Sequence, residues 1–203
     1  MQKYIAFISG LPLGKKSISD DDLSLALMRL GFMNVEPVLN SGNVVFETHP
    51  VGVIGPLEAQ ISRHLRNTFD LDDVWTFIRT PGQLARLLAA TPFSKEEGNS
   101  KGNSIFIVLL SEELDSLSAN KLRIRRNEVD ELVPTGREVY WMRRSSKGEH
   151  IAPPAISEIL DSPATVRSIH AIQQILDQAE NPKTQRPKLV KLEDATRPER
   201  SRQ

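Results

Sequence analysis

The sequence contains no cysteine, and this absence removes several classes of function at once. Without thiols the chain forms no disulfide, binds no metal through thiolate and uses no cysteine nucleophile. Lack of cysteine is also typical of a reducing compartment, so we expect a cytoplasmic protein. Aromatic residues make up only 5% of the chain, which leaves few side chains for the stacking platforms that bind single-stranded RNA.

Excess charge and long apolar runs are absent as well. The chain has 26 basic and 26 acidic residues, so no overall field favours nucleic acid or an anionic membrane. No segment approaches the roughly 18 apolar residues of a membrane-spanning helix. The apolar residues 4–8 are too few for the core of a signal peptide. We therefore expect a soluble protein with no membrane partner.

The sequence predicts no metal, cofactor or familiar catalytic motif. The histidines are far apart, and none forms a ligand-spaced pair with another histidine or an acid. His64 and His170 fall on predicted amphipathic helices, where we expect half-buried packing residues. No Gly-x-Ser-x-Gly nucleophile elbow occurs. No motif in the sequence identifies a reaction.

The first 79 residues predict one βαββαβ unit. Ser19 and Gly31 are suited to begin and end a helix, and the Asn-Ser-Gly-Asn segment at 40–43 favours a tight hairpin turn. The expected strands are residues 4–8, 35–39, 44–47 and 74–79, and the expected helices are residues 19–31 and 56–69. This order is the ferredoxin-like split βαβ. Its right-handed connections bring the loops 10–17, 40–43 and 70–73 to one end of the sheet.

The remaining residues predict a second, irregular βαββα unit and a tail. Expected helices are residues 80–90, 118–123, 154–160 and 162–179, and expected strands are residues 105–110, 128–133 and 138–142. Residues 181–203 hold seven basic and three acidic residues, a net charge of +4, and few apolar ones. We predict domains at 1–79 and 80–180, packed as a single compact unit, and a basic, disordered tail at 181–203.

The loop after the first strand is the best candidate for binding. It carries two glycines and two lysines, and the predicted topology places it beside the 40–43 turn. The candidate ligand-binding residues are Gly10, Gly14, Lys15, Lys16, Ser41 and Asn43. Loop amides and lysines at one place favour a small anion. The alternative is a surface loop whose lysines pair with the acids at 70–73. Its spacing is one residue short of a nucleotide phosphate loop, and Pro12 removes an amide donor.

A second candidate is a basic patch in the second half, formed by Arg123, Arg125, Arg126, Arg143 and Arg144. Acids lie among these residues, so a salt-bridged surface is favoured over a track for nucleic-acid phosphates. RNA recognition by the first sheet is also disfavoured. Phe7 is suitably placed, but the strands are apolar on both faces and we expect both faces to be covered.

Several motifs resemble a bacterial family, domain of unknown function 1697. The most specific are Ser-Gly-Asn-Val-Val-Phe at 41–46 and Gly-Arg-Glu-Val-Tyr at 136–140, with further similarity at residues 4–10, 30–35, 91–93 and 162–165. The resemblance covers residues 1 to about 179 and implies two ferredoxin-like halves packed together in an α+β fold with C-terminal helices. It implies no activity.

The chain is a divergent member by this comparison. Its first loop lacks the polar Arg-Gly-Ile-Asn-Val-Gly-Gly run typical of the family, Glu149 and His150 replace a Ser-Lys pair, and only Arg167 remains of a Thr-Arg-Asn-Trp-Asn run. We carry forward three hypotheses: a non-catalytic module for a small anion, a nucleic-acid-associated protein using the basic patch and tail, and an enzyme whose site lies between the halves.

Overall fold

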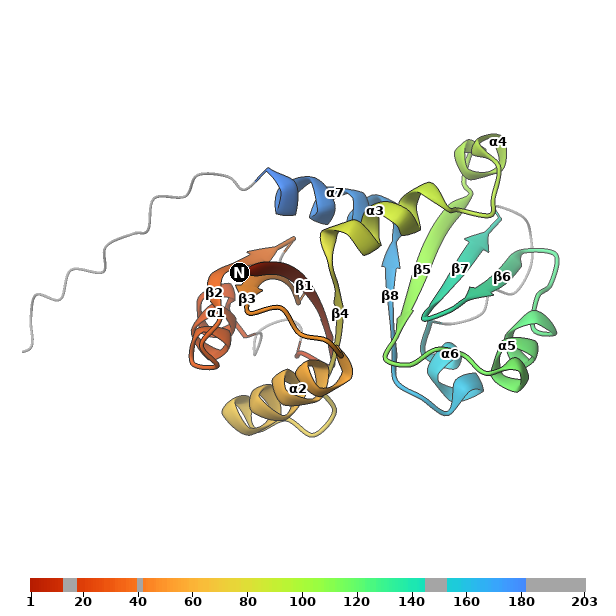
Figure 1. Cartoon of the computed structure of the whole chain (residues 1–203). Coiled ribbons are helices and arrows are strands. Elements are labelled where there is room, and N and C mark those ends of the chain that lie inside the picture. The colour runs from red at the N-terminus through yellow and green to blue at the C-terminus, as the bar shows by residue number, and fades with distance from the viewer. Residues whose placement is uncertain (13–17, 40–41, 145–152, 182–203) are drawn as a thin grey trace, which may run out of the picture.

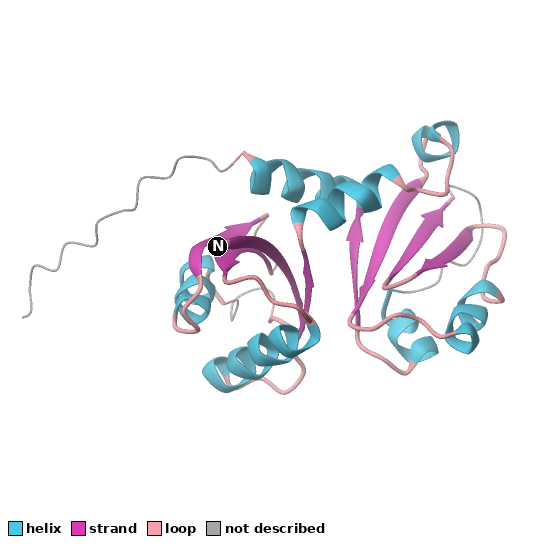
Figure 2. Ribbon diagram, viewed as in Figure 1, coloured by secondary structure: helices cyan, strands magenta, loops and turns pink. Residues whose placement is uncertain are grey.

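The computed structural model describes residues 1–12, 18–39, 42–144 and 153–181. These residues form two four-stranded antiparallel sheets with helices (Figures 1 and 2). The first half contains β1 (Gln2–Ser9), α1 (Asp20–Met28), β2 (Met33–Val38), β3 (Asn43–Thr48), α2 (Gly55–Phe69) and β4 (Trp75–Arg79). The chain continues through α3 (Pro81–Ala89), α4 (Lys95–Asn99), β5 (Ser104–Leu110), α5 (Ser116–Arg123), β6 (Asp130–Thr135), β7 (Glu138–Arg143), α6 (Pro153–Leu160), β8 (Ala164–Ser168) and α7 (Ile169–Glu180).

The first half is the predicted ferredoxin-like unit, with strand order β2-β3-β1-β4. The hydroxyl of Ser19 caps α1 by accepting a hydrogen bond from the Asp22 amide. Gly31 follows the end of that helix with φ +84°, a conformation that favours glycine. The α+β fold and the two halves are confirmed.

The second half differs from prediction at its C-terminal end. The segment expected to begin a helix at residue 162 instead forms β8, which pairs with β5 to give the order β6-β7-β5-β8. The last helix begins only at Ile169, where the Ser168 hydroxyl accepts from the Ala171 amide. This half is therefore a complete βαββαβ unit and not an irregular one. The short helix α4 was also missed, although Ser94 and Glu97 form a capping box at its start.

The registers of the central strands place matching positions in the two halves. Ile5 of β1 lies opposite Arg79 of β4, and Ile107 of β5 lies opposite Arg167 of β8. On the other side, Phe7 lies opposite Asn43 and Leu109 lies opposite Glu138. Arg79 thus corresponds to Arg167, and Asn43 corresponds to Glu138. Each arginine directly precedes the residue that caps the next helix, Thr80 for α3 and Ser168 for α7.

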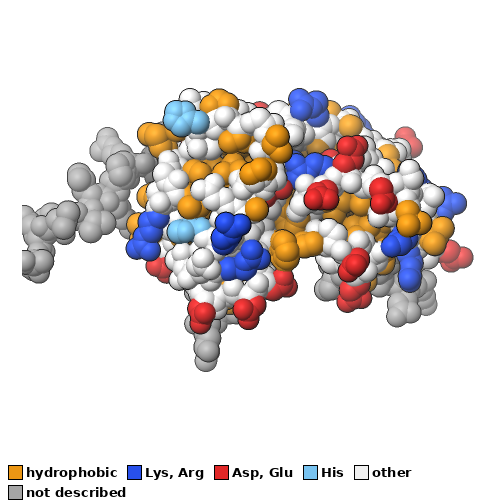
Figure 3. Space-filling view, turned by 60° about the horizontal axis from the view of Figure 1, so that its bottom comes forward, with side chains coloured by type: hydrophobic (Ala, Val, Ile, Leu, Met, Phe, Trp, Pro, Cys, Tyr) orange, Lys and Arg blue, Asp and Glu red, His pale blue; other side chains and the backbone are white. Residues whose placement is uncertain are grey.

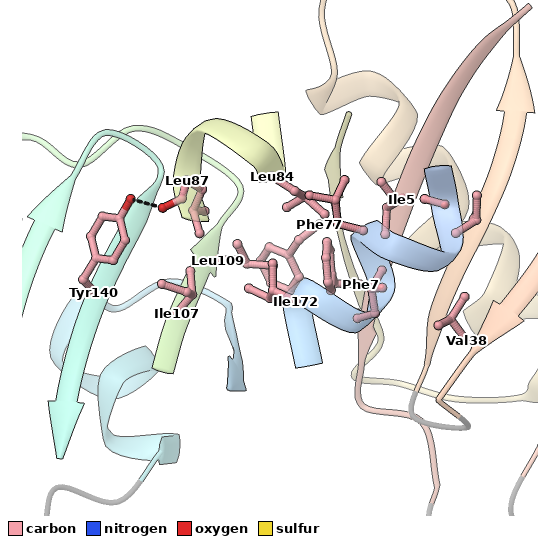
Figure 4. Packing of buried hydrophobic residues seen from close by; sticks show 14 of the residues in the cluster. Ile5, Phe7, Val38, Phe77, Leu84, Leu87, Ile107, Leu109, Tyr140 and Ile172 are labelled. Atoms are coloured by element: carbon pink, nitrogen blue, oxygen red, sulfur yellow. Dashed lines mark hydrogen bonds between the residues drawn. The ribbon is translucent and has the colours of Figure 1, made fainter. Parts of the chain in front are cut away.

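The central core lies between the halves, and each half contributes one helix, α3 or α7, that packs against the other half. Figure 4 shows Phe7 and Phe77 of the first sheet near Ile172 of α7, with Ile107 and Leu109 of the second sheet close by. The hydroxyl of Tyr140 donates to the carbonyl of Leu87 in α3 at 2.9 Å. Two further links tie α7 to the first sheet: the Lys3 amine donates to the Ala179 carbonyl, and the Gln178 amide to Glu36.

Both sheets are covered on both faces, as their apolar strands predict. Helices α1 and α2 pack on the outer face of the first sheet, and α5 and α6 pack on the outer face of the second. In Figure 1, α3 and α7 lie side by side and bridge the two halves. Phe7 is 0% exposed, so it offers no surface on which RNA bases could stack.

Candidate functional site

The described residues at the loop end of the first sheet are tightly packed. Gly10 has φ +79°, and a Cβ added there would lie 1.6 Å from the carbonyl oxygen of Asp73. The amide of Ile8 donates to the carbonyl of Gly42 at 2.7 Å. The end of β1, the hairpin turn and the loop before β4 therefore meet, as the topology predicts. Gly10 has a structural reason to be glycine, because two backbones approach closely there.

Four of the candidate residues cannot be placed at this end. Gly14, Lys15, Lys16 and Ser41 lie outside the described residues. Asn43 is described and is 1% exposed. Its amide nitrogen donates to the carbonyl of Val38 at 3.3 Å. Its amide oxygen accepts a hydrogen bond from the other half of the molecule.

The donor to Asn43 is Arg167, a site residue that the sequence alone did not select. Its Nε donates to Asn43 Oδ1 at 2.9 Å, its Nη1 to the Thr165 hydroxyl at 2.7 Å, and its Nη2 to the Ile8 carbonyl at 3.2 Å. The guanidinium carbon lies 6.0 Å from the centroid of the Phe7 ring. Burial lowers the pKa of Arg167 to about 10. The signal that pointed to it was its retention within an otherwise altered family motif.

The equivalent arginine of the first half meets a different partner. Arg79 is 1% exposed, and its Nε donates to the carboxylate of Glu138 at 2.7 Å. Its Nη2 donates to the carbonyls of Leu110 and Arg137 at 3.0 and 3.1 Å. Burial lowers the pKa of Arg79, and the charge of Glu138 opposes that shift.

A second carboxylate completes the cluster around Arg79. Glu58 of α2 accepts from Arg137 at 2.8 Å and lies 3.8 Å from Arg79 Nη1. The backbone amide of Ile78 also donates to Glu58, at 2.7 Å. The Nε of Arg137 is buried and has no hydrogen-bond partner among the described residues. One arginine therefore faces carboxylates, whereas the carboxylate position opposite Arg167 is occupied by the neutral amide of Asn43.

The basic patch divides into two parts in the structure. Arg143 lies 3.6 Å from Asp130, and Arg144 contacts Glu97 and Glu131 at 3.3 and 2.5 Å. The exposed part consists of Arg123, Arg125 and Arg126, which lie at and just after the end of α5.

We expect no measurable binding of a generic oligonucleotide near physiological salt, because three exposed cations contact too few phosphates. Fluorescence anisotropy at low and moderate salt checks this, since phosphate contacts release counterions and make affinity steeply salt-dependent. Tight, salt-sensitive binding that disappears in the Arg123→Ala, Arg125→Ala, Arg126→Ala triple variant would contradict this expectation.

The described histidines do not form a site. His64 is partly buried, and its Nε2 lies 2.8 Å from the carbonyl of Ala26. His170 is exposed on α7 and is not the half-buried packing residue predicted. Within the described ranges, no cluster of three His, Asp or Glu side chains is suited to a metal ion. None of the helices described there is both long and apolar enough to cross a membrane.

Comparison with known proteins agrees with the architecture and supplies no activity. The family model described as a protein of unknown function, DUF1697, matches residues 1–140. The chain belongs to the DUF1697 family. This DUF1697 chain is also similar in structure to the conserved bacterial protein SP0830 from Streptococcus pneumoniae, with a TM-score of 0.60 and 17% identity, over 89% of this chain and 99% of that one. No curated protein matches it.

Proposed function

We propose that this DUF1697 protein is a non-catalytic module that binds a small anion at the end of the first sheet, where Arg167 and Asn43 meet. The observation that supports this most directly is that a guanidinium is held in a fixed position at this end. Arg167 donates hydrogen bonds to oxygens of Asn43, Thr165, Val166 and Ile8.

These hydrogen bonds hold the guanidinium in a fixed position. Arg167 is only partly buried, so a ligand can approach it. A fixed cation in a partly desolvated place attracts a carboxylate or phosphate more strongly than a mobile surface lysine does. The sequence-based candidates Gly10, Gly14, Lys15, Lys16 and Ser41 remain part of the proposal. We also propose a cytoplasmic location, which the absence of cysteine supports.

The sharpest test gives Arg167 a carboxylate partner like the one that Arg79 has. Asn43→Asp places a carboxylate opposite Arg167, as Glu138 already stands opposite Arg79. We expect this variant to lose at least about tenfold in affinity for inorganic phosphate, because the new carboxylate repels the anion and occupies the guanidinium. Its melting temperature without ligand should change little, because the new ion pair with Arg167 offsets the lost hydrogen bond to the Val38 carbonyl. Titration calorimetry with phosphate, and melting curves, measure the two quantities.

The matched control is Glu138→Gln, which removes the carboxylate at the equivalent position beside Arg79. It should lower the melting temperature by leaving a buried charge without its partner, while the response to phosphate stays intact. Equal phosphate affinity in the wild type and Asn43→Asp would show that the anion does not bind where Arg167 and Asn43 meet.

A further inference from the structure

Two helices that occupy equivalent places in the two halves expose apolar side chains. Helix α1 follows the first strand of its half, and α5 follows the first strand of the other. Leu25 and Met28 of α1 are 54% and 48% exposed. Leu117 of α5 and Ile124 at its end are 67% and 79% exposed. No other helix in the described part of the chain exposes a large apolar side chain. Scattered apolar residues on a surface need no explanation, but a pair on each of two equivalent helices indicates surfaces that a partner covers.

The exposed face of α1 is acidic at its N-terminal end. Leu25 and Met28 are three residues apart, so they are neighbours on one face of the helix. Asp21 and Asp22 lie four and three residues before Leu25, on the same face and in the first turn. Neither carboxylate takes part in an ion pair among the described residues. The face thus joins an apolar surface to negative charge.

The exposed face of α5 carries the opposite charge, at its C-terminal end. Leu117 and Ile124 are seven residues apart, which is about two helical turns, so they lie on one face. Lys121 lies four residues after Leu117 on that face, and Arg125 follows in the turn that ends the helix. Neither cation forms an ion pair within the described ranges. Figure 3 shows hydrophobic and basic side chains side by side at the end of the molecule where α5 lies.

The two faces are complementary when the helices run antiparallel. Asp21 lies four residues before Leu25, and Lys121 lies four residues after Leu117. Both spacings correspond to about 6 Å along a helix axis. When Leu25 lies opposite Leu117 in an antiparallel pair, Asp21 therefore lies opposite Lys121. The positive end of one helix dipole then lies beside the negative end of the other, which adds to the attraction.

We propose that these faces bind each other between two copies of this chain, with α1 of one copy packed against α5 of the next. They do not meet within one copy, because α1 and α5 lie at opposite ends of the molecule (Figure 1). The contact is head to tail, so each added copy leaves one face of each kind free and association continues beyond a dimer. Pairs of identical faces are disfavoured because they bring like charges together. This surface is independent of the proposed anion site.

Sedimentation velocity of the full chain tests the contact, at protein concentrations up to about 1 mM because small interfaces are weak. We expect the mean mass of the wild type to rise past that of a dimer with increasing concentration. It should fall again at high salt, which screens exposed charges.

Two variants each block one face. Leu25→Lys removes the apolar contact of α1, and Leu117→Lys removes that of α5. Each variant alone should stay monomeric, because its one intact face has no partner. Mixed together they should form dimers and nothing larger, because one supplies an intact α5 face and the other an intact α1 face. Val53→Lys is the matched control: Val53 is 71% exposed but lies in a loop outside both faces, so this variant should associate as the wild type does.

Charge reversal tests the pairing of the two helices. Lys121→Glu should weaken association by about tenfold or more, because it places like charges together. Adding Asp21→Lys to the same chain should restore association. A wild type that remains monomeric at every concentration overturns the proposal. So does a mixture of the two lysine variants that stays monomeric, or either of them associating alone as strongly as the wild type.

Discussion

Replacing Arg79 by methionine is expected to lower the free energy of unfolding by about 3–5 kcal/mol, which is what removal of one partner from a buried ion pair costs. Methionine has no positive charge, so Glu138 loses the arginine that it pairs with across the contact between the halves, and Glu58 keeps only Arg137. Three carbonyls, of Ile78, Leu110 and Arg137, also lose a donor. For a chain of this size the melting temperature should fall by about 10 °C.

Denaturant unfolding of the variant measures this loss directly. Arg144→Met is the matched control, because Arg144 also contacts two carboxylates but its side chain is 29% exposed. Exposed ion pairs contribute about 0–1 kcal/mol, so this control should unfold nearly as the wild type does. Adding Glu138→Gln to Arg79→Met should restore part of the loss. Equal stability of the Arg79 and Arg144 variants would show that the cluster does not hold the halves together.

Gly10→Ala is expected to cost about 3 kcal/mol or more. The added Cβ would lie 1.6 Å from the Asp73 carbonyl oxygen, so two backbone segments must separate. The residue would also keep a left-handed backbone conformation, which costs an L-residue about 1–2 kcal/mol. Separation at this point would disturb the end of β1 and, through Ile8, the contact with Arg167.

Gly31→Ala separates these two causes. Gly31 has φ +84° and no atom within 4 Å of an added Cβ, so only the backbone conformation is penalised. We expect about 1–2 kcal/mol there. A Gly10→Ala variant no less stable than Gly31→Ala in thermal and denaturant unfolding would mean that the close approach at Asp73 is relieved without cost.

Local patterns were sufficient to predict the first half of the fold. Alternating apolar residues in strands, the cap at Ser19 and the hairpin turn before Asn43 act over a few residues, so each can be recognised from the chain itself. The same information predicted that both sheet faces would be covered. The boundary between the predicted domains, at residue 79, remains a prediction.

The C-terminal strand shows where local patterns fail. Residues 164–168 contain two apolar residues, Ala164 and Val166, in a short segment before an amphipathic helix, and so few apolar residues do not separate a helical from an alternating pattern. Pairing with β5 decides the matter, because it supplies backbone hydrogen bonds along the whole segment. Thr165 and Val166 are also β-branched, which favours a strand.

The sequence by itself determined the α+β class, the first ferredoxin-like unit, the family and the candidate residue Asn43. Only the tertiary structure decided which side chain faces Asn43, because Arg167 lies 124 residues further along the chain and the two meet only when the halves pack. The same packing brings Glu138 into contact with Arg79 and the Asn43 amide into contact with Arg167. That difference depends on two strand registers and the contact between sheets, and no local pattern encodes a contact of that range.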